Sequence, residues 1–457
     1  MSDYPLSGAQ ADRIARDDKQ FVWHPFTPMR QYAAADPTII RAAEGFELID
    51  TRGRRYIDGF GSLWCNLHGH QVPQIDQAIR DQLDRVAHST LLGHGSLPSI
   101  ELGRRLVADS PEGLEKVFYS DSGATAVEVA QKMAFQYNYN LGRRDKTRFV
   151  AFRKGYHGDT IGAVSVGGID AFHGIFGPLL FETDFVDCPN PYHHPAGDEA
   201  GDVVLEQIEN LLADKAEQIC AVIIEPRIQG AGGMLTHPDG FLAGLRRLTR
   251  RYDVMLIADE VATGFYRTAS LYSCQAENVC PDMLCLGKGL TGGYLAVAAT
   301  LTTQEIYDAF CGEISESRTL YHGHTFTGNA LGCAAAVASY DLMVEKNFAQ
   351  TVPARACQIA SSLAELADHP HVGDIRQRGM MVGIELVADR QGPVRFDPAT
   401  RTGVAVCAAA KEHGIITRPL GDTVTLMPAP GIDEATLGRL LDGIIKTIQE
   451  YFARDAV

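Results

Sequence analysis

Four short apolar runs separated by helical patterns constrain the fold of this chain more than any other feature. The runs lie at residues 116–120 (KVFYS), 148–152 (RFVAF), 220–226 (CAVIIEP) and 254–260 (VMLIADE). They are nearly continuous in β-branched and other apolar residues, as central strands of a parallel sheet are when both faces of the sheet are covered. Alternation of such strands with helices predicts an α/β domain with a mainly parallel central sheet.

The segments between the runs have the apolar stripe of an amphipathic helix. The stripe residues are Val127, Ala130, Met133, Ala134 and Tyr137 in segment 124–139, and Leu242, Leu245 and Leu248 in segment 240–252. We expect a large domain over residues 76–328 and a smaller α+β domain over 329–457, entered through a helix at 329–345. Residues 1–75 are expected to pack with the small domain and to line the active site.

Charge and cysteine content exclude several classes of function. The chain has 457 residues and a formal net charge of −16. Broad binding to nucleic acid or to an anionic membrane needs a basic face, so we expect neither partner. Ten cysteines form no disulfide framework and no paired zinc-ligand spacing, which favours a reducing cytoplasm. Neither a secretory signal nor a long apolar run is visible.

Two signals lie where strands of the predicted sheet end, which is where open parallel sheets bind ligands. Residues 120–124 form a turn of small residues before a helix, and its free amides would hold a phosphate. The alternative is an ordinary helix start capped by Ser122. Asp259 ends the run 254–260 and suits a ribose, a metal or a protonated ring nitrogen. A salt bridge or a helix cap is the alternative.

The third signal is Lys288, which stands between Gly287 and Gly289 after an apolar run. Lysine is rarely buried unless it is paired or reactive. A dinucleotide-binding loop is disfavoured because the lysine lies inside the turn, and a P-loop is excluded because Asp282 replaces its first glycine. An amine at a strand end suits a Schiff base with an aldehyde.

Together the three signals predict pyridoxal 5′-phosphate as the cofactor. The turn would hold the phosphate, Asp259 the pyridinium nitrogen, and Lys288 the aldehyde. Two His-x-His pairs occur, His68 with His70 and His322 with His324. No third ligand cluster accompanies them, so no metal site is expected.

Over nearly its whole length, the chain resembles the class III (fold-type I) pyridoxal-phosphate aminotransferases. The resemblance rests on residues 121–134 (DSGATAVEVAQKMA), 156–160 (YHGDT), 256–265 (LIADEVATGF), 284–293 (LCLGKGLTGG) and 322–329 (HGHTFTGN). Within the class, residues 23–29 (WHPFTPM), 61–70, 156–170 and 417–422 (TRPLGD) are most similar to the diaminopelargonate (7,8-diaminononanoate) aminotransferases of biotin biosynthesis.

The resemblance implies a role for each matching residue. Lys288, Asp259 and Tyr156 would be catalytic, with Lys288 the Schiff-base lysine and Tyr156 stacked on the pyridoxal ring. The remaining implied contacts are Ser122, Gly123 and Ala124 to the phosphate, Thr325 to the phosphate of the other subunit of a homodimer, and Phe26, Trp64, Arg267 and Arg418 to the substrates, with Arg418 on the substrate carboxylate.

The implied reaction converts 8-amino-7-oxononanoate to 7,8-diaminononanoate, with lysine or S-adenosylmethionine as the small-molecule amine donor. Phe26 and Leu63 stand where many members have Tyr and an aromatic residue, and Tyr266 replaces a glycine. The first two changes favour lysine, because a sulfonium and an adenine need aromatic faces and polar groups. The alternatives are an ω-amine:pyruvate aminotransferase, which the residues HPFTPM argue against, an aminomutase, and a cofactor-binding scaffold without activity.

Overall fold

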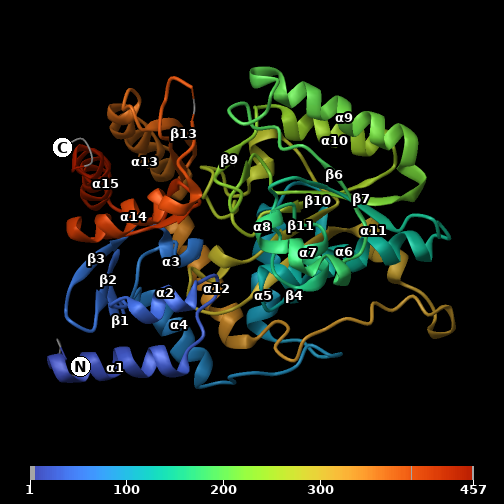
Figure 1. Cartoon of the computed structure of the whole chain (residues 1–457). Coiled ribbons are helices and arrows are strands. Elements are labelled where there is room, and N and C mark those ends of the chain that lie inside the picture. Colours follow the sequence, from blue (N-terminus) through green and yellow to red (C-terminus); the bar gives the residue numbers. More distant parts are fainter. Residues whose placement is uncertain (1–5, 393, 455–457) are drawn as a thin grey trace.

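A seven-stranded sheet forms the centre of the protein in a computed structural model that describes residues 6–392 and 394–454 (Figure 1). The strand order is β4-β12-β11-β10-β7-β5-β6. The strands are β4 (Leu114–Ser120), β5 (Arg148–Phe152), β6 (Thr183–Val186), β7 (Ile219–Ile224), β10 (Met255–Asp259), β11 (Met283–Leu286) and β12 (Ala298–Thr303). Only β12 runs antiparallel to its neighbours, which confirms the predicted α/β class with a mainly parallel sheet.

The prediction that residues 116–120 form a central parallel strand is wrong. They belong to β4, which lies at the edge of the sheet and pairs only with β12, in antiparallel register. The middle of β4, including Lys116 and Val117, is only half-buried. An edge strand pairs with a neighbour on one side only and commonly carries a charged side chain. Lys116 within the run was therefore the available signal.

Helices cover both faces of the sheet, and alternate strand residues enter two separate cores. Leu256 and Ala258 of β10 join one core, whereas Met255 and Ile257 of the same strand join the other. The main covering helices are α5 (Leu97–Asp109), α6 (Gly123–Asn140), α9 (Ala200–Lys215), α10 (Phe241–Arg251) and α11 (Gln304–Phe310). All five predicted stripe residues of α6 are buried, which confirms its apolar face.

The rest of the chain packs beside the central sheet at the left of Figure 1. An antiparallel sheet contains β13 (Val372–Arg378), β14 (Met381–Leu386), β17 (Thr423–Leu426) and β16 (Arg418–Leu420). Its flanking helices are α13 (Phe348–Leu363), α14 (Thr402–Ala409) and α15 (Glu434–Arg454). The predicted helix near residue 329 is α12 (Ala330–Glu345).

N-terminal and C-terminal segments share a further sheet. Its strands are β1 (Ile40–Glu44), β2 (Glu47–Asp50), β3 (Arg55–Asp58) and β15 (Ile415–Ile416), and β15 pairs with β3 in parallel. The remaining short elements are α1 (Gly8–Phe21), α2 (Met29–Ala34), α3 (Gly61–Trp64), α4 (Pro73–Leu83), α7 (Ile161–Ser165), α8 (Asp170–His173), β8 (Ile228–Gln229) and β9 (Leu235–Thr236). None of the described helices combines the length and apolar composition that a bilayer crossing needs.

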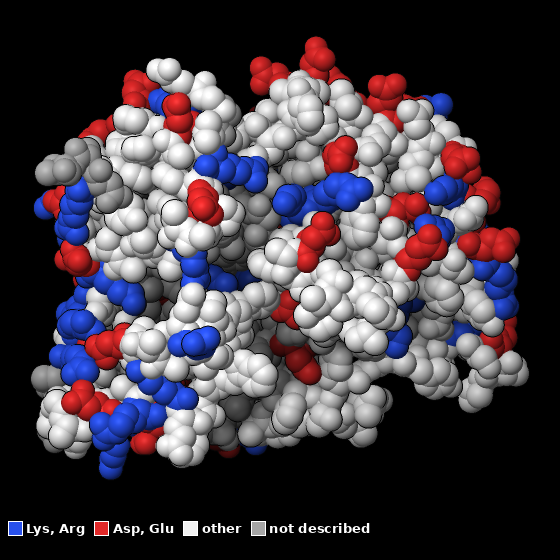
Figure 2. Space-filling model, viewed as in Figure 1, with Lys and Arg blue, Asp and Glu red and all other residues white. Residues whose placement is uncertain are grey.

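Acidic and basic side chains are interspersed over the face drawn in Figure 2. Several Lys and Arg side chains lie around the hollow at the centre of this face, between the C-terminal segments and the central sheet. Asp and Glu side chains lie around the same hollow, so both signs of charge are present there.

Candidate active site

A cavity of about 430 Å³ lies at the carboxyl ends of the central strands. Seven of the predicted site residues line it, namely Trp64, Ser122, Gly123, Ala124, Tyr156, Asp259 and Lys288. They come from segments more than 220 residues apart in sequence, Trp64 to Lys288, and the sheet brings them together. This position is the one at which parallel sheets bind ligands.

Lys288 lies two residues after the end of β11, and its side chain lines the cavity. Among the described residues its amine makes no hydrogen bond or ion pair, and its nearest recorded partner is the Trp64 ring, 5.3 Å from Nζ to the ring centroid. Burial lowers the pKa of Lys288, and the carboxylates of Asp259 and Glu225 oppose this shift. A lowered pKa makes the neutral, nucleophilic amine more accessible near neutral pH.

The glycines around Lys288 are required by close packing. A Cβ at Gly287 would lie 3.3 Å from the Cα of Gly123, and a Cβ at Gly289 would lie 3.1 Å from the Leu67 side chain. At Gly123 itself, a Cβ would come within 2.3 Å of Val261. These contacts bring the end of β11 against the start of α6, so the lysine and the helix amides share one cavity.

The N-terminus of α6 supplies amide donors to the cavity. Ser122 is the N-cap, and its hydroxyl accepts a hydrogen bond from the Thr125 amide in a capping box. The capping interpretation of Ser122 is therefore confirmed, and it does not compete with the ligand interpretation. The amides of Gly123 and Ala124 precede the first intrahelical donors and remain available, and the helix dipole favours an anion beside them.

Asp259 is paired with a histidine that the sequence analysis did not identify. The Nδ1 atom of His157 lies 2.6 Å from Oδ2 of Asp259, and both residues are buried. The second carboxylate oxygen accepts a hydrogen bond from the Val261 amide. The available signal was that His157 follows Tyr156 within the YHGDT motif. The pair fixes the orientation of the carboxylate at the cavity wall.

Glu225 is a second residue that the sequence analysis missed. It is buried, lines the cavity, and accepts hydrogen bonds from the amides of Tyr156 and Gly230. Burial raises the pKa of Glu225 to about 7. The hydroxyl of Tyr156 donates to Asp159 at 2.7 Å, so both ends of the tyrosine are held in place. The signal for Glu225 was a carboxylate directly after the apolar run of β7.

Trp64 enters the cavity from a segment with an unusual backbone. Gly61, Ser62, Leu63 and Trp64 have φ values of +58°, +48°, +64° and +73°. The left-handed conformation costs an L-residue roughly 1–2 kcal/mol, so the segment stores several kcal/mol unless its surroundings compensate. The Trp64 side chain is nevertheless only 7% exposed.

Phe26 and Arg418 lie outside the cavity lining and are linked to it through Phe172. The Arg418 guanidinium is 5.9 Å from the centroid of the Phe26 ring, and it makes no ion pair with any described residue. Phe172 contacts Phe26 at 5.3 Å and Tyr156 at 6.4 Å between ring centroids. A line of aromatic rings therefore leads from an unpaired cation to the cavity.

Arg267 and Thr325 do not line the cavity. Arg267 is 1% exposed and donates hydrogen bonds to the carbonyl oxygens of Asn66, Met427 and Pro428. The structure thus places it against the Trp64 segment, where a Cβ at Gly61 would lie 3.0 Å from its Nη2 atom, and its contact with substrate stays a prediction. Thr325 is exposed within one chain, on the segment between α11 and α12.

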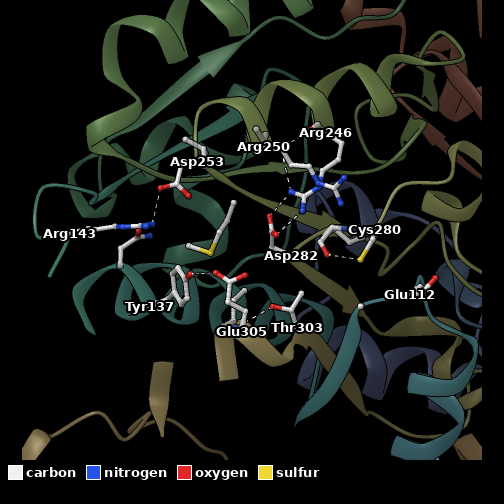
Figure 3. Close-up of a pocket in the computed structure, with 17 residues that line it drawn as sticks. Glu112, Tyr137, Arg143, Arg246, Arg250, Asp253, Cys280, Asp282, Thr303 and Glu305 are labelled. Atoms are coloured by element: carbon white, nitrogen blue, oxygen red, sulfur yellow. Dashed lines mark hydrogen bonds and ion pairs between the residues drawn. The ribbon is translucent and has the colours of Figure 1, made fainter. Parts of the chain in front are cut away.

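A second cavity of about 410 Å³ lies at the opposite edge of the same sheet (Figure 3). Its charged groups are largely paired with one another: Arg246 contacts Asp282 at 2.6 Å, and Arg143 contacts Asp253 at 3.0 Å. The described residues contain no group of three or more His, Cys, Asp or Glu placed to hold a metal. The two ion pairs neutralise part of the charge of this cavity, and none of the described lysines lines it.

The first cavity fits pyridoxal 5′-phosphate in three independent ways. The unpaired amine of Lys288 would bond to its aldehyde, and the free amides of Gly123 and Ala124 would bind its phosphate. The Asp259 carboxylate would pair with its cationic ring nitrogen. Gly158 has a φ of +123°, and a Cβ there would lie 2.3 Å from that of Ala124, so the backbone is also packed closely beside the helix start.

Comparison with known proteins agrees with this geometry. Residues 30–448 match the family model described as aminotransferase class-III. An adenosylmethionine-8-amino-7-oxononanoate aminotransferase of Nitratidesulfovibrio vulgaris is 51% identical, with 98% of this chain and 84% of the relative covered. A relative of the same name from Geobacter sulfurreducens is 46% identical over 94% of this chain and 96% of its own length.

Two solved structures show the same fold. The crystal structure of an enzyme of the same name from Methanocaldococcus jannaschii has a TM-score of 0.92 at 43% identity, covering 96% of this chain and 99% of that one. An (S)-enantioselective omega-transaminase from Thermomicrobium roseum has a TM-score of 0.92 at 31% identity, covering 96% and 98%.

Proposed function

Because the chain belongs to the class III aminotransferases, enzymes that use pyridoxal 5′-phosphate, we propose that it aminates 8-amino-7-oxononanoate to 7,8-diaminononanoate in biotin biosynthesis. The observation that carries the proposal is an unpaired amine, Lys288, in one cavity with a helix N-terminus and a buried Asp–His pair. The names of relatives from several organisms supply the acceptor.

Each part of the cofactor has a residue to hold it. Lys288 would bind the aldehyde, Gly123 and Ala124 the phosphate with Ser122 as the helix cap, and Asp259 the protonated ring nitrogen. The bound cofactor supplies an electron sink for the negative charge that develops when a proton leaves the carbon next to the amine. The Tyr156 ring, held by Asp159 and Glu225, would lie against the cofactor ring.

Lys288 would act as the general base and acid of both half-reactions. Its Nζ accepts the proton from the donor carbon that bears the amino group. In the second half-reaction it delivers a proton to the former carbonyl carbon of the acceptor. The lowered pKa suits this role, because the neutral amine can accept a proton near physiological pH. Asp259, oriented by His157, would lie next to the ring nitrogen.

Arg418 would bind the carboxylate of the acceptor. Its guanidinium makes no ion pair with any described residue, and the Phe26 and Phe172 rings lie between it and the cavity. An unpaired arginine that binds a carboxylate at the end of an apolar path suits an ω-functionalised fatty acid.

Two donors are supported by different observations. The names of the relatives specify adenosylmethionine. Phe26 and Leu63, both largely exposed, lack the hydroxyl and the aromatic ring that a sulfonium and an adenine would use. We propose lysine as the donor and test it against S-adenosylmethionine, each supplied alone at saturation with 8-amino-7-oxononanoate. Product formed only with S-adenosylmethionine would reverse the donor while leaving the acceptor in place.

The same panel separates the alternative enzymes. The similarity to an omega-transaminase supports an ω-amine:pyruvate aminotransferase as the second candidate. Efficient amination of pyruvate together with no turnover of 8-amino-7-oxononanoate would favour that candidate. An aminomutase would turn over without a second substrate, and a scaffold would turn over none.

A homodimer would complete the site. The segment that carries Thr325 also exposes Ile314, Tyr321 and Phe326, and exposed apolar residues in such numbers are typical of an interface. Phe326 contacts His88 at 4.8 Å between ring centroids, so this segment lies beside residues 84–97, where Leu92 and Leu97 are also exposed. The partner's copy of Thr325 would reach the phosphate. All ten cysteines are free, which supports a cytoplasmic location.

A further inference from the structure

The backbone of α3, which carries Trp64, adopts a conformation that its own sequence disfavours. Four successive residues, Gly61 to Trp64, have positive φ, and the turn is closed by hydrogen bonds from the amides of Cys65 and Asn66 to the Gly61 carbonyl. Only the first of the four is a glycine, the residue that adopts this region without strain. Ser62, Leu63 and Trp64 must therefore be held by contacts from outside the turn.

Asp58 supplies the contacts on one side. This residue ends β3 and is 5% exposed. Its Oδ1 atom accepts a hydrogen bond from the Ser62 amide at 2.9 Å, and its Oδ2 atom accepts one from the Ser62 hydroxyl at 2.7 Å. His70 lies 3.3 Å from the same Oδ2 atom. Both carboxylate oxygens are therefore committed to the first strained residue of the turn.

The other side of the turn is closed by packing. Arg267 donates to the carbonyl of Asn66 at 2.6 Å, and a Cβ at Gly61 would lie 2.8 Å from the Met427 carbonyl oxygen. The turn delivers the Trp64 ring to a narrow place. A Cβ at Gly230 would lie 3.1 Å from this ring, and the Lys288 amine lies 5.3 Å from its centroid.

We propose that Asp58 is a positioning residue: its carboxylate holds the left-handed turn 61–64, and the turn sets the Trp64 ring over the Lys288 amine. Asp58 itself lies outside the cavity lining and acts through Ser62 and Trp64. The link to catalysis rests on the proposed role of Lys288. The link from Asp58 to the turn does not, and it is tested without substrate.

The chain offers a direct readout, because Trp64 is one of only two tryptophans and the other, Trp23, is 87% exposed. In the full-length protein, Trp23→Phe leaves Trp64 as the sole tryptophan. Adding Asp58→Ala should shift its emission to longer wavelengths and increase its quenching by acrylamide, because the released turn lets the ring leave its buried position.

Asp50→Ala in the same background is the matched control. Asp50 also ends a strand of this sheet, is 1% exposed, and accepts hydrogen bonds from the amides of Arg52 and Arg54. Its loss should lower stability without moving Trp64. Unchanged Trp64 emission in Asp58→Ala, or an equal shift in both variants, would overturn the proposal.

A second-site variant separates backbone strain from a general loss of stability. Ser62→Gly added to Asp58→Ala should restore part of the original emission, because glycine adopts positive φ without strain. No recovery would contradict the proposal. If Asp58→Ala does not fold, Ser62→Ala decides. Ser62→Ala keeps the hydrogen bond from the backbone amide to Asp58 and loses the one from the hydroxyl. A red shift smaller than that expected for Asp58→Ala supports the proposal, and the absence of any shift overturns it.

The catalytic consequence has its own signature. In the loaded enzyme Lys288 would be bound to the cofactor aldehyde, so the group that titrates is its linked nitrogen. When Trp64 withdraws, solvent should stabilise the protonated form of this nitrogen and raise its pKa. In the holoenzyme, the pH midpoint of the cofactor absorption change should move upward in Asp58→Ala and return in the Ser62→Gly double variant. A wrong assignment of the substrate leaves both spectroscopic results unchanged, whereas an unmoved midpoint contradicts the link from the turn to Lys288.

Discussion

Two cavities of nearly equal volume lie at opposite edges of one sheet, about 430 Å³ at the carboxyl ends of the parallel strands and about 410 Å³ at their amino ends. In the second, Arg246 and Asp282 form a two-point ion pair, and Tyr137 donates to Glu305 (Figure 3). In the first, the Lys288 amine has no hydrogen-bond or ion-pair partner among the described residues. The comparison teaches that an unpaired nucleophilic amine, and not the available space, distinguishes the reactive site.

The strongest test of this difference removes the uncompensated amine. Lys288→Ala should abolish turnover, because both proton transfers and the bond to the cofactor aldehyde depend on Nζ. The measurement is product formation by purified enzyme with added cofactor. Lys116→Ala, a change to a half-buried lysine on the edge strand, is the control and should retain activity. Wild-type turnover in Lys288→Ala would end the assignment.

Asp259→Asn should lower turnover roughly a hundredfold, the scale expected when one preorganised electrostatic partner of a developing charge is lost. Asparagine keeps the size of the side chain and removes the charge opposite the ring nitrogen. Cofactor binding is measured in parallel by absorbance. An Asp259→Asn enzyme that binds cofactor and turns over normally would mean that the carboxylate is structural.

Arg418→Ala should raise the KM of the keto acceptor far more than that of the amine donor. Loss of the cation leaves the acceptor carboxylate unpaired, at a cost of about 2–5 kcal/mol when the pair is desolvated. Steady-state kinetics with each substrate varied in turn measures the two effects. Equal changes in both KM values would argue against carboxylate recognition by Arg418.

The smallest effect on turnover is expected at the second cavity. Asp282→Ala leaves the largely buried Arg246 without its partner, and such a loss destabilises a fold by about 3–5 kcal/mol. Turnover per folded molecule at low temperature should nevertheless equal that of the wild type. Chemical denaturation and kinetics on the same sample check both parts. A large loss of kcat in folded Asp282→Ala would remove the distinction between the cavities.

The cofactor end of the first cavity was predictable because its residues belong to short, local patterns. Lys288 between glycines, Asp259 at a strand end and Ser122 before a helix each carry their signal within a few positions, and the parallel sheet brings strand ends together. The same logic failed at 116–120, where the pairing with β12 depends on a segment some 180 residues later, as the register of Val117 with Leu301 illustrates. Local apolar content does not specify which neighbour a strand takes.

The substrate end was less predictable because its geometry depends on contacts between distant residues. The positive φ of Ser62 accompanies its hydrogen bonds to Asp58, and Gly61 packs against the Met427 carbonyl, contacts that no local pattern reveals. Arg267 donates to main-chain carbonyls of residues distant in sequence, and its contact with substrate stays a prediction. The pairing of His157 with Asp259 joins residues 102 positions apart. Such contacts become visible only after the chain has folded.

The central claim is that the reactive amine of this protein is Lys288, and chemical trapping tests it most directly. The wild-type protein is incubated with pyridoxal 5′-phosphate, reduced with borohydride and digested, and the modified peptide is sequenced by mass spectrometry. The account predicts one stoichiometric modification, on Lys288, that blocks turnover. Stoichiometric modification of another lysine, with Lys288 unmodified, would contradict it.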